Sequence, residues 1–109
     1  MPVERRQSSR VEVSWPATVT TPHGPIAGTT QNICLDGAFI RCPEVPDLDE
    51  SFRLLLRPAE KHFLLATAER IWSDTFISDE SIFYGMGVRF KYIPDDDREF
   101  LDTAIAAHA

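Results

Sequence analysis

Three arginines stand close together near the N-terminus, in the segment MPVERRQSSR. Two of them, Arg6 and Arg10, form an R-x-x-x-R pair, and Arg5 lies beside it. A guanidinium group stays charged, binds phosphate oxygens with two parallel N–H donors and stacks on aromatic rings. The arm formed by residues 1–10 could therefore bind an anion. Arginines at this spacing also occur in ordinary solvated termini, so the pair alone does not specify a site.

A second candidate segment, Asn32–Gly37, reads N-I-C-L-D-G. The Asn32 amide offers both hydrogen-bond donors and an acceptor. Asp36 followed by Gly37 predicts a tight turn or bulge, because glycine tolerates positive φ and lets another group approach the backbone closely. We call this segment the barrel motif. Turns of this composition are common, so the barrel motif is also non-specific on its own.

The charge of the chain is unevenly distributed. The net charge is −6 overall, yet residues 1–10 carry three arginines against one glutamate, a local balance of +2. An acidic body argues against a general DNA or RNA binder, whose affinity comes mainly from neutralising phosphates. A barrel that binds single strands, as OB-like folds do, is disfavoured for the same reason. A basic arm on an acidic body favours a small, local anion site.

Other residues that could do chemistry lack partners in the sequence. His23 and His62 have no cysteine or carboxylate at ligand spacing, and both are interpreted as surface residues. The acidic stretch 44–50 lacks the spacing and central glycine of a calcium loop. No G-x-S-x-G elbow is present, and Cys34 has no evident histidine. We therefore expect neither an enzyme nor a metal site.

The two cysteines, Cys34 and Cys42, are too few for a disulfide framework and lack zinc-site spacing. We interpret them as reduced thiols of a cytoplasmic protein. No segment approaches the length of apolar residues needed to span a membrane, and no apolar stretch follows the N-terminal arginines as in a signal peptide. No membrane insertion is expected.

Hydrophobic periodicity indicates the elements that must position these residues. Period-two alternation or short apolar runs predict strands at residues 11–20, 26–33, 38–42, 52–57, 63–72 and 83–92. Residues 74–81 are predicted to be a polar turn. After Pro94, a run of acidic residues and an apolar stripe at helical spacing predict a C-terminal helix. Regularly spaced short strands favour a closed or nearly closed antiparallel barrel in one domain, residues 11–109, preceded by the arm.

At this point the chain resembles the PilZ domain family. That family combines an R-x-x-x-R arm with a [D/N]-x-S-x-x-G turn some 20–30 residues later, in a six-stranded barrel that ends in a helix. Arg6 and Arg10 match the arm, and Asn32 and Gly37 match the ends of the second motif. Residues 84–90, YGMGVRF, are similar to the family's penultimate Gly-x-Gly-Val-x-Phe strand. The resemblance implies a mainly all-β fold, a six-stranded antiparallel PilZ-like β-barrel with a C-terminal α-helix.

The resemblance also implies a ligand, the bacterial second messenger cyclic di-GMP, and no other cofactor. Arginine suits its two phosphates and also matches guanine O6 and N7. Trp72 occupies a place where some relatives stack an aromatic ring on a guanine, although it could equally be a core or rim tryptophan. The implied ligand-binding residues are Arg5, Arg6, Arg10, Asn32, Cys34, Gly37 and Trp72.

One position departs from the family pattern, because Cys34 stands where the motif has serine. Losing one hydrogen bond costs roughly 0.5–1.5 kcal/mol, or about two- to tenfold in affinity. Asp36 would repel a phosphate unless its side chain points to solvent. We expect a receptor that relays its signal to an unidentified effector protein when the arm orders, as a monomer or a ligand-linked dimer. The alternative is a degenerate adaptor that binds no nucleotide and acts through protein contacts.

Overall fold

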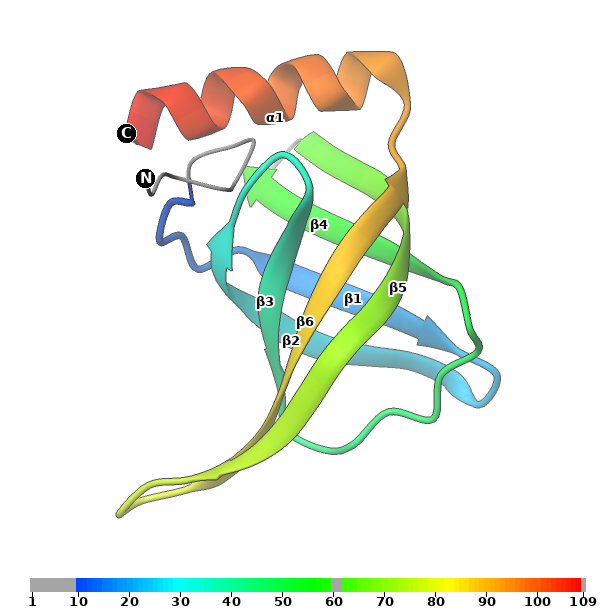
Figure 1. Cartoon of the computed structure of the whole chain (residues 1–109), viewed down its shortest axis with the longest axis vertical. Coiled ribbons are helices and arrows are strands. Elements are labelled where there is room, and N and C mark those ends of the chain that lie inside the picture. The colour runs from blue at the N-terminus through cyan, green and yellow to red at the C-terminus, as the bar shows by residue number, and fades with distance from the viewer. Residues whose placement is uncertain (1–9, 60–61, 109) are drawn as a thin grey trace, which may run out of the picture.

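The computed structural model describes residues 10–59 and 62–108. Within them the chain forms six strands followed by one helix (Figure 1). The elements are β1 (Pro16–Thr21), β2 (Gly24–Ile33), β3 (Gly37–Cys42), β4 (Phe52–Ala59), β5 (His62–Ile77), β6 (Ile82–Tyr92) and α1 (Asp95–His108).

The strands close into an antiparallel barrel in the order β1-β2-β3-β6-β5-β4. The last ladder pairs residues 17–19 of β1 with residues 54–56 of β4 and so joins the two ends of the sheet. Closure satisfies the backbone groups that an open sheet would expose at its edges. The predicted six-stranded barrel with a C-terminal helix is confirmed.

Alternation places one set of side chains inside the barrel, where they form a single apolar core. Fully buried members from successive elements include Val19, Ile40, Leu54, Leu64, Met86 and Leu101. Burying a side chain of this size contributes roughly 1.5–3 kcal/mol relative to leaving it exposed. The core therefore fixes which side chains of each strand point outward, toward the candidate site.

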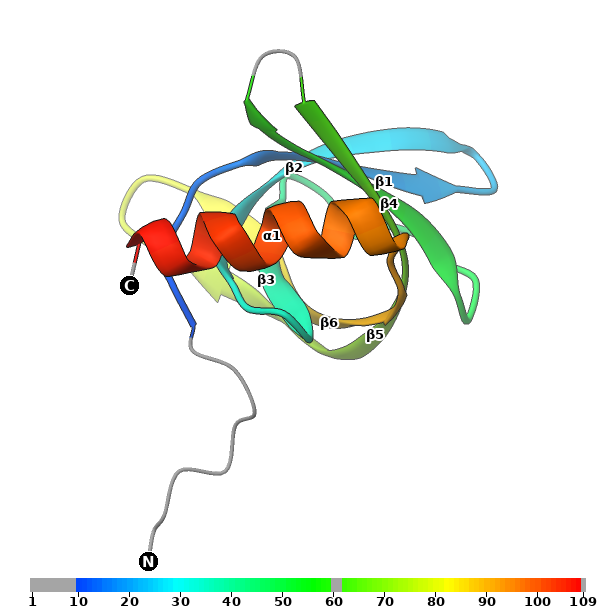
Figure 2. The ribbon, with the colours of Figure 1, turned by 90° about the horizontal axis from the view of Figure 1, so that it is seen from above.

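Helix α1 lies across one end of the barrel, as the two perpendicular views show (Figures 1 and 2). Its Leu101 and Ile105 are buried in the core, and Asp97 accepts a hydrogen bond from the Leu65 backbone N–H at 3.2 Å. Three acidic residues occupy its first turn, where they complement the helix dipole. In the described part of the chain, no helix has the length and apolarity required to cross a bilayer.

The first strand differs from its prediction. Residues 11–20 alternate as expected, with Val11, Val13 and Trp15 buried, but regular strand pairing begins only at Pro16. Before it, main-chain hydrogen bonds join Val11 to Ile33 and Thr30 to Trp15. Between them, the Thr30 hydroxyl accepts from the Trp15 N–H at 2.9 Å and donates to the Val13 carbonyl at 2.6 Å. A side chain thus supplements the backbone pairing where the regular ladder is interrupted.

The predicted polar turn at residues 74–81 is wrong. Strand β5 continues to Ile77 and β6 begins at Ile82, so the connection is residues 78–81, closed by a 2.8 Å hydrogen bond from the Ser78 N–H to the Ser81 carbonyl. Phe76 and Phe83 pair across the two strands and stack at 5.2 Å. This ring pair stabilises strand pairing within a sequence that is otherwise polar. The resulting hairpin projects beyond the barrel (Figure 1).

Candidate functional site

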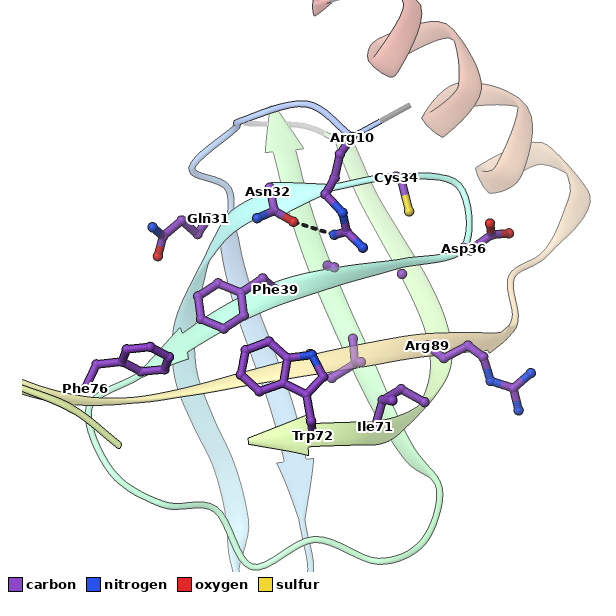
Figure 3. Close-up of a pocket in the computed structure, with 14 residues that line it drawn as sticks. Arg10, Gln31, Asn32, Cys34, Asp36, Phe39, Ile71, Trp72, Phe76 and Arg89 are labelled. Carbon is purple, nitrogen blue, oxygen red and sulfur yellow. Dashed lines mark hydrogen bonds between the residues drawn. The ribbon is translucent and has the colours of Figure 1, made fainter. Parts of the chain in front are cut away.

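A pocket of about 590 Å³ opens on the outer face of the barrel, where β2, β3, β6 and β5 lie side by side (Figure 3). Its size falls in the range of roughly 300–1,000 Å³ that is typical of small-molecule sites. It is lined by Arg10, Gln31, Asn32, Cys34, Asp36, Gly37, Ala38, Phe39, Ile71, Trp72, Phe76, Gly87, Val88 and Arg89. All five described residues of the predicted site are in this set.

Two β-bulges shape the pocket from opposite sides. In the β2–β3 register Thr30 pairs with Ile40 and Asn32 with Phe39, which leaves Gln31 unpaired. In the β5–β6 register Ile71 is left unpaired in the same way. A bulge interrupts alternation and re-aims side chains. Consequently two consecutive residues of each strand, 31–32 and 71–72, line the pocket.

Arg10, the one described residue of the arm, meets the barrel motif at the pocket. The Arg10 guanidinium donates a hydrogen bond from Nη1 to Asn32 Oδ1 at 2.6 Å and points into the pocket (Figure 3). These residues are 22 positions apart in the chain. Arg5 and Arg6 lie outside the described residues.

The opposite wall of the pocket is aromatic. The Trp72 ring is 49% exposed and stacks on Phe39, with centroids 5.3 Å apart and planes 18° apart. A Cβ on Gly87 would lie 2.3 Å from Trp72 Nε1, so the indole rests directly on the bare backbone of β6. Trp72 is therefore a rim residue and not a core residue. Its exposed part is free to meet a planar group in the pocket.

The PilZ domain model matches residues 4–107. The chain belongs to the PilZ domain family. A search of the curated proteins finds no match.

Solved structures share the fold at low sequence identity. The Bacillus subtilis inhibitor of motility MotI/DgrA is 21% identical with a TM-score of 0.78, and the alignment covers 96% of this chain and 51% of that one. The PilZ domain of Escherichia coli YcgR with c-di-GMP is 12% identical with a TM-score of 0.76, covering 96% and 92%. The K. pneumonia MrkH–c-di-GMP complex is 16% identical with a TM-score of 0.77, covering 95% and 52%. The chain thus spans about half the length of MotI/DgrA and MrkH.

Within this PilZ barrel, the barrel motif forms the connection from β2 to β3. The Cys34 N–H donates to the Gly37 carbonyl at 2.9 Å, and the Asp36 carbonyl accepts from the Phe90 N–H at 2.8 Å. Cys34 is buried, at 4% exposure, although it lines the pocket. The Asp36 carboxylate points away from the Arg10 guanidinium (Figure 3). These two main-chain hydrogen bonds anchor the turn with cysteine at the serine position.

Of the two roles predicted for Gly37, the structure shows the close approach of another group and not the positive φ. Its φ is not positive: among the described residues, only Gly24 adopts such a φ, at 118°. A Cβ on Gly37 would lie 2.1 Å from the Val88 carbonyl oxygen of β6. Glycine is needed here because β3 approaches the β6 backbone too closely for any side chain.

Phe39 and Gln31 are pocket residues that sequence reasoning missed. Phe39 lies at the centre of an aromatic ladder, which we define as Trp72, Phe39, Phe76 and Phe83. Phe39 and Phe76 meet edge to face, with centroids 5.9 Å apart. The available signal was the alternating glycine pair Gly85 and Gly87, since missing side chains on one face leave room for rings from neighbouring strands.

Arg89 also lines the pocket but is held away from its centre. It donates from Nε to Glu69 Oε2 at 2.6 Å, and its Nη2 approaches the same oxygen. Figure 3 shows its side chain directed away from the pocket, whereas that of Arg10 points into it. Of these two pocket-lining arginines, Arg10 is the one aimed at the space that a ligand would occupy.

The two histidines interpreted as surface residues have neighbours that the sequence did not indicate. His23 is exposed as predicted, and its Nε2 lies 3.1 Å from Asp47 Oδ2. His62 is partly buried and stacks on Phe100 of α1, with ring centroids 3.8 Å apart. Both pairs lie outside the pocket.

Proposed function

We propose that this PilZ domain is a receptor for cyclic di-GMP, which binds in the outer pocket. The observation that carries the proposal is the hydrogen bond between Arg10 and Asn32, because it brings the family's two motifs together at one pocket. Solved PilZ structures with c-di-GMP, those of YcgR and MrkH, have the same fold and support this choice of ligand.

The pocket's groups suit the chemistry of this ligand. Its phosphates would pair with the arginines of the arm, Arg5, Arg6 and Arg10, in bidentate hydrogen bonds. The Asn32 amide would meet a guanine edge once it exchanges its bond with Arg10. A guanine would stack on Trp72, whose orientation Phe39 and Gly87 already fix. Stacking of this type contributes about 1–3 kcal/mol per base.

The output is a binding event and not a reaction, so the domain acts as a receptor and not as an enzyme, with cyclic di-GMP as a ligand and no further cofactor. Ordering of the arm over the pocket would create a new surface at the mouth formed by Arg10 and Asn32. An effector protein in the cytoplasm would bind that surface. The domain would act as a monomer or as a dimer joined by ligand.

Calorimetric titration of the full chain with cyclic di-GMP tests the proposal. We expect micromolar or tighter affinity. Arg10→Ala removes a charged hydrogen-bonding partner and should weaken binding by about 10- to 150-fold. Arg57→Ala is the matched control, because Arg57 is an exposed arginine on β4 whose guanidinium lies over Phe63, away from the pocket. The control should change affinity less than twofold.

The titration also separates the receptor from the nucleotide-free adaptor. An absence of heat at high ligand concentration, in both the wild type and Cys34→Ser, would overturn the receptor proposal and favour the adaptor. Stoichiometry from the same titration distinguishes one bound nucleotide from two.

A further inference from the structure

The β5–β6 hairpin leaves the barrel and continues without neighbours among the described strands. The β4–β5 ladder ends at Ala68, where it pairs with Phe52, and the β3–β6 ladder ends at Tyr84, where it pairs with Cys42. Beyond these points the two strands pair only with each other, up to Ile77 opposite Ile82. The result is the arm-like projection at the lower left of Figure 1.

The two faces of this projection are covered unequally. On one face Phe76 stacks on Phe83, and the Arg41 guanidinium lies 4.0 Å above the Phe83 ring. On the other face Ile77 and Ile82 stand opposite each other, 78% and 64% exposed. An isolated two-stranded hairpin is at best marginally stable in water, so the ring stack holds its shape. The isoleucine pair adds apolar surface that the described chain leaves uncovered.

The charged side chains of the tip itself are all acidic, and Arg41 of β3 lies on the opposite, aromatic face over Phe83. Residues 73–83 contain Asp74, Asp79 and Glu80 and no lysine or arginine. Two copies meeting through their tips would bring like charges together, which costs several kcal/mol at an interface. An anionic membrane surface would be repelled in the same way. An apolar surface that carries basic side chains around it is complementary to the tip.

The β5 backbone offers a second means of attachment. From Glu69 to Ile77 the edge of β5 turned away from β6 has no strand partner among the described residues. A free edge can accept an added strand through main-chain hydrogen bonds, with side-chain contacts supplying specificity. Ile71 and Ile77, both exposed, lie along this segment.

We propose that the hairpin tip, residues 73–83, is a docking surface for a protein whose contact region is apolar at its centre and carries lysine or arginine around it. The tip adjoins the nucleotide pocket, because Phe76 lines it, but Ile77, Asp79, Glu80 and Ile82 do not line it. Substitutions at these four residues therefore test the proposal independently of cyclic di-GMP binding.

Site-specific photo-crosslinking of the full chain, in the cell that encodes it, is the first step of the test. A photoreactive amino acid replaces Ile82, and in the control chain it replaces Val45, which is equally exposed at 64% but lies on the loop between β3 and β4. We expect an adduct with a second protein from position 82 and none from position 45. The captured protein is then identified, purified and titrated against the full chain.

Two double variants decide the outcome. Each should lower the affinity for the purified partner at least tenfold: one is Ile77→Ser with Ile82→Ser, the other Asp79→Lys with Glu80→Lys. The control variant Val45→Ser should change that affinity less than twofold. Because all these side chains are exposed, the thermal unfolding midpoint and the nucleotide affinity should be unchanged. The proposal is overturned by equal adducts at both positions, by an adduct only with a second copy of the chain, or by a partner indifferent to both double variants.

Discussion

Strand β6 has two faces that are built in opposite ways. Its inward residues, Tyr84, Met86 and Val88, are buried and fill the barrel with their own side chains. Its outward residues Gly85 and Gly87 contribute no side chain, and aromatic rings from β3 and β5 lie on the bare backbone instead. Strand β6 thus contributes its own side chains to the core, whereas the rings that form the pocket wall over β6 come from other strands.

This difference separates the fold from the site along a single strand. A change on the inward face removes packing that every molecule needs in order to fold. A change on the outward face displaces aromatic rings that the barrel does not need in order to fold. A ligand in the pocket would lose its contacts with those rings. Substitutions on the two faces should therefore have different effects on unfolding free energy and on affinity for cyclic di-GMP.

The largest expected effect comes from the inward face. Met86 is fully buried, so Met86→Ala leaves a cavity and should lower the free energy of unfolding by about 2–5 kcal/mol. Denaturant titration measures this change. Nucleotide affinity of the folded fraction should shift less than threefold. A large affinity loss at unchanged stability would contradict the division between the faces.

A second inward group should make stability depend on pH. Burial, and to a lesser extent the Glu44 carboxylate, raise the pKa of the Cys42 thiol from 9.0 to about 11. Well below pH 9 the thiol is protonated in both states and contributes no slope. Between pH 9 and 11 the unfolded chain loses this proton more readily than the folded one, so the free energy of unfolding falls, by at most roughly 2–3 kcal/mol.

The comparison of denaturant titrations for the wild type and Cys42→Ala, from pH 7 to 11, isolates this contribution from other alkaline titrations. The wild type should lose more stability than the variant above pH 9, with parallel curves below it. Parallel curves throughout would show that the buried thiol does not carry the effect.

On the outward face, Gly87→Ala should affect binding more than folding. The new Cβ would lie 2.3 Å from Trp72 Nε1, so the indole must move off β6, while the backbone φ suits alanine. If Trp72 stacks on a guanine, affinity should fall by about 5- to 150-fold. Calorimetry measures affinity, and tryptophan fluorescence reports the displaced ring.

Trp72→Ala provides the cross-check for this prediction. Because both substitutions remove the same stacking surface, the double variant should be little weaker than either single one. Fully additive losses would mean that Gly87 acts on the ligand by another route.

The inward face is also the part that the sequence predicted well. Alternation of apolar and polar residues, together with short apolar runs, located all six strands, because a buried face requires apolar side chains at every second residue. The motif residues Arg10 and Asn32 were assigned to one site through the resemblance to the PilZ family, and the structure brings them into contact.

The outward face could not be predicted in the same way. The bulge in β2 shifts the alternation by one residue, but Gln31 and Asn32 are both polar, so the sequence did not indicate that they would share one rim. Phe39 reads as an ordinary strand residue until the glycines of β6 are placed beneath it. The hairpin at residues 74–81 was interpreted as a turn because its strands are held by ring stacking and not by burial in the core.

The smallest expected effect on affinity concerns the two cysteines, which place one sulfur atom at the pocket and the other in the core. Cys34 lines the pocket and Cys42 does not, although both are buried. Cys34→Ser restores a stronger donor and acceptor at the pocket and should tighten cyclic di-GMP binding by about two- to tenfold. Cys42→Ser should leave affinity unchanged and cost about 1–3 kcal/mol of stability if its core hydroxyl finds no partner. An equal affinity change in both variants would mean that a substitution in the core alters nucleotide affinity as much as one at the pocket. That result would contradict the division between the inward and outward faces of the barrel.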